Sequence, residues 1–392
     1  MFKNTRNILI VLLFFNLQAM GQTELNFQDI DSVTYGYYKS GEWKNLIEAG
    51  NIALNNGFDY KFLRERIGYA YFITGDYVSS LRYFGKAYEF DSHDQFTLSY
   101  LYFSNLNVGR KETAGYYLSR MSPEQRELYS IDPSRAFESI DIELGTEITS
   151  TDQRSNPLYY RFGIRSAILP RVSLYQSLSG YNQSGIIEYP SLDYDFRIKQ
   201  IEYYGLISIS LLSHINLKTA YHFLHSDFSS SITYSHLGYA GISASIGSSD
   251  IGVDLSLIDN SQYVTKQAGL KATYRLPGRR NINFTGGVTL MNQQDSSMLI
   301  YSGRAGISVS RKVALSADFT YGYQNYYNDF DGMYVYNSID PTTFRTGITA
   351  YYFLNNNITM WFNTGYETKE YFENRNYSYY QISLLGGLQW RF

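Results

Sequence analysis

From residue 139 to the C-terminus, apolar side chains recur at every second position, and this alternation constrains the fold more than any other feature of the chain. The segment 313–324 shows it most clearly, because small or polar residues fill the intervening positions. Its apolar face consists of Val313, Leu315, Ala317, Phe319, Tyr321 and Tyr323. The segments 251–257 and 281–291 repeat the pattern. A period of two with one apolar and one polar face predicts strands whose apolar side meets lipid and whose polar side meets a lumen.

The composition excludes several classes of protein. The 392 residues include no cysteine, which removes disulfide frameworks, thiolate metal sites, catalytic thiols and lipid attachment at a cysteine. The formal net charge of −3 gives no general attraction for nucleic acid, so we expect no nucleic-acid partner. Mean hydropathy is −0.30, and no apolar run approaches the ~20 residues that a membrane helix needs. An aromatic content of 17% together with 31 glycines is instead typical of outer-membrane barrels.

The connections between the expected strands differ in length. Short ones fall near residues 169–170, 213–214, 247–250, 277–280, 311–312 and 355–357, whereas 183–196 and 325–341 are longer and rich in Tyr, Asn and Asp. Short turns on one side and long loops on the other are typical of the periplasmic and extracellular ends of a barrel. We count about 14 strands, an even number as bacterial single-chain barrels have, although 171–182 and 230–239 alternate poorly.

The last strand carries the sharpest signal. Leu384, Gly386, Leu388, Trp390 and Phe392 share one face, and the chain ends on this aromatic residue. A final strand that ends in Phe resembles the signal that the bacterial outer-membrane assembly machinery recognises. Trp390 and Phe392 are therefore the expected C-terminal assembly signal. The resemblance implies that the barrel assembly machinery and outer-membrane lipid are partners of this chain, and that it comes from a Gram-negative cell.

Residues 1–21 have the features of a secretory signal peptide. Lys3 and Arg6 precede an unbroken apolar run over 8–15, and Ala19 and Gly21 place small residues before the expected cleavage site. The alternative is an uncleaved anchor, but the apolar run is too short to cross a bilayer.

Residues 27–128 contain a repeat of 34 residues, marked by Gly41, Gly75 and Gly109. The middle copy resembles a tetratricopeptide (TPR) repeat through Ile67-Gly68, Tyr71, Gly75-Asp76-Tyr77, Phe84 and Ala87. The resemblance implies helical hairpins that stack because each cannot bury its own apolar stripe. We therefore expect an α+β multidomain protein. Residues 22–135 form a periplasmic TPR-like domain of α-helical hairpins, and residues 139–392 form an antiparallel transmembrane β-barrel in the outer membrane.

If the TPR geometry carries over, the first helix of each repeat lines a concave groove. The groove positions are Tyr35, Tyr38, Phe62, Tyr69, Phe72, Phe96 and Phe103. A groove of aromatic rings suits stacking on sugars or gripping an apolar peptide, so a periplasmic protein or a polysaccharide is the expected partner. The alternative is that these rings pack against the barrel rim or the linker.

The polar face of the strands carries charges of both signs. Those expected to point into the lumen are Asp141, Glu143, Glu147, Glu202, Asp254, Asp318 and Glu367, with Arg161, Arg165, Lys218, Lys271, Arg275, Arg304 and Arg345. Because an unpaired desolvated charge is costly, this balanced set predicts pairing across the lumen, which closes or narrows it. A pore for a polyion would show an excess of one sign.

No sequence feature indicates catalysis, and we expect neither an enzyme nor a cofactor. GxSxG and HExxH motifs are missing from the sequence, His222 near Glu202 is interpreted as a polar lumen residue, and His93 lies in an expected turn rather than a metal site. Three functions remain. The first is an export conduit similar in layout to TPR-bearing exopolysaccharide exporters, the second is a barrel-anchored scaffold that docks a partner in secretion or envelope assembly, and the third is a small-solute porin. We favour a partner-docking or cargo-docking protein in transport or assembly.

Overall fold

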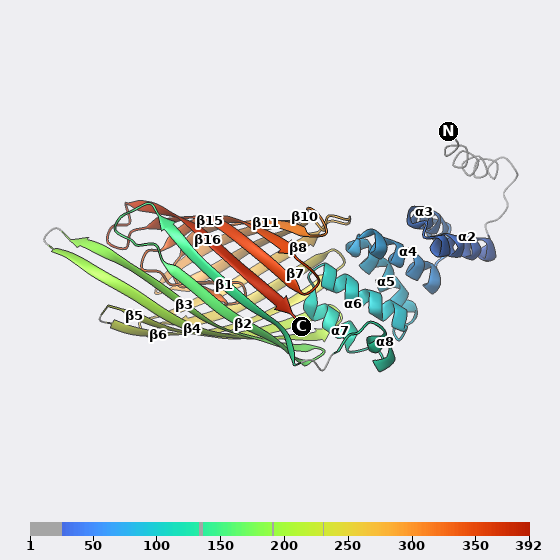
Figure 1. The fold of residues 1–392 in the computed structure, drawn as a ribbon, viewed down its shortest axis with the longest axis horizontal. Coiled ribbons are helices and arrows are strands. Elements are labelled where there is room, and N and C mark those ends of the chain that lie inside the picture. Colours follow the sequence, from blue (N-terminus) through green and yellow to red (C-terminus); the bar gives the residue numbers. More distant parts are fainter. Residues whose placement is uncertain (1–25, 133–135, 190–191, 230) are drawn as a thin grey trace, which may run out of the picture.

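The structure is a computed structural model, and it describes residues 26–132, 136–189, 192–229 and 231–392. The expected signal peptide lies outside the described residues. An array of seven helices comes first, and a barrel follows (Figure 1). The helices are α2 (Phe27–Ser40), α3 (Trp43–Asn55), α4 (Lys61–Thr74), α5 (Tyr77–Phe90), α6 (Gln95–Asn107), α7 (Lys111–Leu118) and α8 (Pro123–Leu128). No helix in this described part of the chain is long and apolar enough to cross a membrane.

The recurring glycines end the first helix of each helical pair. Gly41, Gly75 and Gly109 all have left-handed backbone angles, with φ of 73°, 86° and 80°. Only glycine adopts this conformation without steric cost, so it reverses the chain between two antiparallel helices. Asp76 then starts α5, because its side chain accepts a hydrogen bond from the Ser79 amide. The 34-residue recurrence therefore encodes the turn inside each pair.

Small residues let neighbouring helices approach closely. A Cβ atom added to Gly68 of α4 would lie 2.8 Å from the Phe84 ring of α5, and one added to Gly50 of α3 would lie 2.6 Å from Ile67. The array has two apolar cores, one around Ile30, Leu63 and Ile67 and the other around Phe84, Leu98 and Leu101. Packing of this kind supplies most of the stability of short helices.

Fourteen antiparallel strands close the barrel, as the alternation predicts. They are β1 (Phe137–Thr149), β2 (Leu158–Leu169), β3 (Val172–Tyr189), β4 (Leu192–Leu212), β5 (Ile215–Phe228), β6 (Ser231–Ile246), β7 (Ser249–Asp259), β8 (Val264–Arg275), β9 (Asn283–Gln293), β10 (Ser296–Ser308), β11 (Val313–Gln324), β14 (Thr342–Phe353), β15 (Ile358–Glu370) and β16 (Ser378–Arg391). The first strand closes on the last, with Ile140 opposite Trp390. Two further strands, β12 (Tyr327–Asp329) and β13 (Tyr334–Tyr336), pair only with each other.

The barrel has an apolar exterior. On β7, Ile251, Val253, Leu255 and Leu257 are between 46% and 64% exposed, whereas the alternate residue Ser256 is buried toward the interior. On the last strand, Trp390 and Phe392 are also exposed, with their ring centroids 5.3 Å apart. We call the barrel end that faces the helices the proximal end and the opposite end the distal end (Figure 1).

One expected loop is wrong. Residues 183–196 were expected to form a long connection, but Gln183 pairs with Ile198 and Ile186 pairs with Asp195, so the segment continues β3 and β4. The resulting long hairpin reaches past the rest of the barrel at the distal end (Figure 1). The alternation is weak in this segment because its inward face is apolar: Ile187 and Phe196 are buried there, and Ile339 of the connection between β11 and β14 packs against them.

Candidate functional site: the barrel lumen and its inserted hairpin

The connection between β11 and β14, residues 325–341, turns into the lumen and fills part of it. Its core is the β12–β13 hairpin, and Tyr327 is 1% exposed. The tip turns sharply at Phe330, Asp331 and Gly332, where φ is 52°, 62° and 84°. Sequence analysis interpreted this connection as an outer loop and did not place it inside the barrel. We refer to residues 325–341 as the lumen hairpin.

The lumen hairpin packs against an apolar patch on one wall. The patch consists of Tyr175, Tyr204, Leu206, Ala220, Leu237, Tyr239 and Ile258, which come from β3 to β7. Tyr326, Met333 and Val335 of the hairpin pack against it. This patch gives the physical reason why 171–182 and 230–239 alternate poorly, since inward positions there are apolar rather than polar. Burial of such side chains contributes roughly 1.5–3 kcal/mol each.

Polar contacts hold the hairpin tip on the same wall. Asp331 accepts hydrogen bonds from Lys218 Nζ at 2.8 Å and from the Tyr239 hydroxyl at 2.9 Å. His222 lies between two acceptors, with Nδ1 2.8 Å from the Gly332 carbonyl oxygen and Nε2 3.0 Å from Glu202 Oε2. His222 therefore fastens the hairpin.

A second set of contacts reaches the opposite wall. Asp329 forms an ion pair with Arg345 of β14. Tyr334 donates a hydrogen bond to Glu143 of β1 at 3.1 Å. Because the tip contacts both walls, the lumen hairpin spans the barrel interior.

The structure places the predicted lumen charges as follows. Most of them have a partner of opposite charge: Asp141 and Glu143 pair with Arg161, Glu202 with His222, Lys271 with Asp254, Arg345 with Asp329, and Glu367 with Lys369. Two arginines lie over aromatic rings instead, Arg165 over Tyr175 and Arg304 over Phe330. Asp318 lines the lumen cavity described below. Asp329 and Asp331, which sequence analysis missed, supply part of the pairing from the hairpin rather than from a facing strand.

A cavity of about 460 Å³ remains between the lumen hairpin and the wall formed by β1 to β4, β10, β11 and β14 to β16. Aromatic, amide and charged side chains line this lumen cavity, among them Trp361, Asn363, Tyr351 and Asp318. Its volume lies within the roughly 300–1,000 Å³ of small-molecule sites.

Helix α7 lies across one side of the proximal opening (Figure 1). Arg110, at its start, pairs with Asp250 at 2.9 Å and donates to the Gly247 carbonyl oxygen at 2.9 Å. Gly115 sits so close to the barrel that an added Cβ would lie 2.3 Å from the Pro170 carbonyl oxygen. Further hydrogen bonds join Asn216 to Thr113, Arg171 to Ser119, and Arg275 to Val108. The helices are therefore fixed to the rim.

A second cavity, of about 280 Å³, lies on the other side of the proximal opening. Val78 and residues 107–109 line it from the helical array, and Asn283, Gly306 and neighbouring residues line it from the barrel. It shares Ser316 and Tyr351 with the lumen cavity. The two cavities therefore lie next to each other across these two residues.

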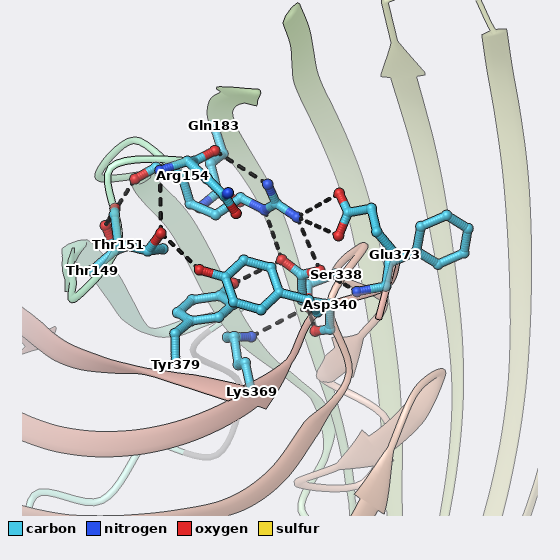
Figure 2. A network of polar contacts seen from close by, with 12 residues as sticks. Thr149, Thr151, Arg154, Gln183, Ser338, Asp340, Lys369, Glu373 and Tyr379 are labelled. Atoms are coloured by element: carbon cyan, nitrogen blue, oxygen red, sulfur yellow. Dashed lines mark hydrogen bonds and ion pairs between the residues drawn. The ribbon is translucent and has the colours of Figure 1, made fainter. Parts of the chain in front are cut away.

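At the distal end, one arginine joins three connections (Figure 2). Arg154, between β1 and β2, pairs with Asp340 at the end of the lumen hairpin at 2.7 Å and with Glu373 between β15 and β16 at 3.1 Å. Lys369 donates to Ser338 of the hairpin at 3.2 Å. The hairpin is therefore anchored at its base as well as at its tip.

The predicted groove residues form an aromatic row along α2, α4 and α6. Tyr69 contacts Tyr38 at 5.3 Å and Phe96 at 6.0 Å between ring centroids, and Phe72 contacts Phe103 at 6.4 Å. Tyr35 and Phe62 stand apart from this row, 47% and 57% exposed. Tyr100, which sequence analysis missed, contacts Tyr69, Phe72, Phe84, Phe96 and Phe103. Tyr129, after α8, packs on Phe103 at 5.0 Å.

No family model matches the chain, and no curated protein matches it. Among solved structures, a bacterial polysaccharide outer membrane secretin is similar over 66% of this chain and 99% of its own, at 8% identity and a TM-score of 0.42. The P. putida toluene transporter TodX is similar over 71% of this chain and 94% of its own, at 7% identity and a TM-score of 0.42. The Acinetobacter baumannii outer membrane protein Omp33 is similar over 66% of this chain and 99% of its own, at 11% identity and a TM-score of 0.37. At these identities the similarity concerns the fold alone.

Proposed function

We propose that this protein is an outer-membrane conduit that is closed at rest and carries a TPR-like docking module in the periplasm. The apolar exterior of a closed barrel supports the membrane location, because lipid can cover side chains such as Leu255 without exposing unpaired backbone groups. The proximal end, with its short turns and the helical array, corresponds to the periplasmic side. The expected signal peptide over 1–21 is consistent with export across the inner membrane.

The lumen hairpin is the observation that carries this proposal. It lies inside the barrel but takes no part in the fourteen-stranded ladder, since β12 and β13 pair only with each other. Side-chain contacts such as Asp331–Lys218 hold it, and these can break while every strand of the wall stays paired. A constriction built in this way is removable, which favours a gated passage over a permanently open porin.

The aromatic row supports a docking role for the helices. Tyr35 and Phe62 present exposed rings beside the row, and exposed rings of this kind bind apolar peptide side chains or the faces of sugars. Because α7 is fixed to the rim, a partner or cargo held by the helices is kept beside the cavity at residues 107–109. The helices therefore deliver what they bind to the proximal opening.

Single-channel conductance tests the proposal. The purified protein in a planar bilayer is expected to show small, infrequent openings, and a variant lacking residues 327–336 is expected to show a large steady conductance. A variant in which Asn-Gly replaces residues 188–193, at the end of the β3–β4 extension, is the control and is expected to behave like the unmodified protein, because it keeps Ile186 and Ile187 beside the base of the lumen hairpin. Equal conductance in all three proteins contradicts the proposal. Docking is tested by cross-linking from a photoreactive residue at Tyr35 or Phe62 in cells.

A further inference from the structure

The lumen cavity contains a flat aromatic surface at Trp361. Its indole lies against Gly387 of the neighbouring strand, because a Cβ atom added to that glycine would lie 2.4 Å from the ring. Only glycine leaves room for the ring to lie on the wall in this way. Trp361 also lines the cavity, so the indole presents a surface to whatever occupies it. Rings that are exposed in this manner stack on flat, C–H-rich surfaces.

Polar groups without a partner line the same cavity. Among the residues that the structure describes, the carboxylates of Asp318 and Glu147 have no hydrogen bond and no ion pair within 4.0 Å, and both line the cavity. The Arg304 guanidinium also lines the cavity, lies over the Phe330 ring and has no hydrogen bond or ion pair within this described part of the chain. Asn363 lies two residues from Trp361 on the same face of β15 and donates to Thr349 at 2.9 Å and to the Ile348 carbonyl oxygen at 3.4 Å, so its side-chain oxygen remains as an acceptor. The cavity therefore offers acceptors and donors next to an aromatic platform.

The charges of the cavity point to a neutral occupant. Its lining includes five carboxylates and four basic groups, interspersed rather than separated. An anion or a cation entering the cavity meets groups of its own sign, whereas hydroxyl groups can donate to the carboxylates and accept from the basic groups. A compound with many hydroxyl groups and an apolar C–H face meets both requirements. That description fits a neutral carbohydrate.

We propose that the lumen cavity binds a neutral oligosaccharide, with one sugar ring stacked on Trp361 beside Asn363 and the hydroxyl groups of further rings bonded to Asp318 and Arg304. The inference rests on the proposed function, because a sugar in the lumen is cargo only if the barrel conducts. We expect the sugar to reach the lumen cavity from the helical array past Ser316 and Tyr351, which line both cavities.

Tryptophan fluorescence tests the proposal directly. The chain has three tryptophans, so the variant W43F/W390F keeps only Trp361. The full-length variant is prepared in lauryldimethylamine oxide, since a detergent with a sugar head group competes for the cavity. Cellobiose and N,N′-diacetylchitobiose are the probes, with glucuronate, glucosamine and sorbitol as comparisons. We expect a saturable change in emission with at least one disaccharide at millimolar concentration, and a weaker or unsaturable response to the charged sugars and to sorbitol.

Binding calorimetry on single variants, with the other two tryptophans unchanged, measures disaccharide affinity of the folded protein. It therefore separates the loss of stacking on residue 361 from a loss of folding. Trp361→Ala is expected to weaken disaccharide binding about tenfold or more, whereas Trp361→Tyr retains most of it because a ring remains. Trp390→Phe, on the outer face, leaves binding unchanged. If no disaccharide binds to folded protein, or if Trp361→Ala binds as well as the unmodified chain, the inference is overturned. A large conductance in the variant lacking residues 327–336 then still supports the conduit, so the two failures are distinguishable.

Discussion

Arg154 and Asp340 form an ion pair that is completely buried at the distal end of the barrel. Arg154 Nε lies 2.7 Å from Asp340 Oδ2, and the two side chains are 0% and 1% exposed. The pair joins the β1–β2 connection to the base of the lumen hairpin, across 186 residues of sequence. The Tyr379 hydroxyl and the Phe372 amide also donate to Asp340, so this carboxylate has several partners.

Replacing Arg154 by Met is expected to destabilise the barrel, because it leaves the Asp340 carboxylate buried without a countercharge. The loss in free energy of unfolding is about 3–5 kcal/mol, measured by urea titration in detergent. Lys86→Met removes an exposed pair with Glu89 and is the control, with a change below about 0.5 kcal/mol. A similar small effect for both variants contradicts the role given to Arg154.

Glu65 is expected to make the helical array less stable as pH rises. Burial, followed by the nearby Asp94 carboxylate, raises the pKa of Glu65 to about 7, and Thr97 donates a hydrogen bond to it at 2.9 Å. The folded state therefore holds this proton at pH values where the unfolded chain, with an ordinary glutamate, has lost it. The contribution is fully present below about pH 4.5 and is lost as pH rises toward 7, by at most about 1.4 kcal/mol per pH unit.

Thermal unfolding of the helices, followed by circular dichroism at 222 nm between pH 4 and 8, measures this dependence. Glu65→Gln cannot ionise and is expected to flatten the curve over that range. An identical slope in the variant and the unmodified protein assigns the dependence to other groups.

Gly115→Ala is expected to displace α7 from the barrel rim, because the new methyl group meets a backbone oxygen that cannot move aside. Gly85→Ala on α5 is the matched control, since a Cβ atom there has no neighbour within 4 Å. The control is expected to stabilise the array by about 0.5–1 kcal/mol through helix propensity alone. Hydrogen exchange of α7 amides measures both. Faster exchange after Gly115→Ala alone is the expected result, and equal exchange in both variants opposes it.

Phe392→Ala is expected to lower the amount of protein in the outer membrane several-fold without changing its refolding in detergent. The side chain is 43% exposed, and the backbone amide of residue 392 keeps its hydrogen bond to the Glu138 carbonyl oxygen at 3.1 Å. The variant therefore removes the terminal ring, the expected assembly signal, and retains the closure of the barrel. Leu388→Ala on the same outer face is the control for lost lipid contact. Equal losses for both variants show that the terminal ring has no special role.

The strands of this protein were predictable because their signal is local. An outward residue such as Val313 contacts lipid wherever its neighbours lie, so each strand encodes its own alternation. The same is true of the left-handed glycines at 41, 75 and 109, which act within a single turn. The alternation was weak where inward residues are apolar, as at Tyr175 and Leu237. These residues are apolar because they pack against the lumen hairpin.

The hairpin itself was not predictable, because its position depends on contacts between distant segments. Asp331 and Lys218 are 113 residues apart, and nothing near either residue indicates the other. One signal was available in hindsight: inward apolar residues on β3 to β7 need a partner inside the barrel. The lumen cavity exists because the hairpin lies inside the barrel. Nothing in the sequence around Trp361 therefore indicated that this side chain lines a cavity.

The lumen hairpin is continuous with β11 at one end and β14 at the other, so it stays covalently attached even when its contacts with the barrel wall are broken. A tethered segment rebinds its own site as an intramolecular ligand, at an effective concentration that short linkers place in the millimolar range. A substance that passes through the whole lumen must displace this built-in occupant and is replaced by it on departure. The barrel would thereby reseal itself after each passage without a separate stopper.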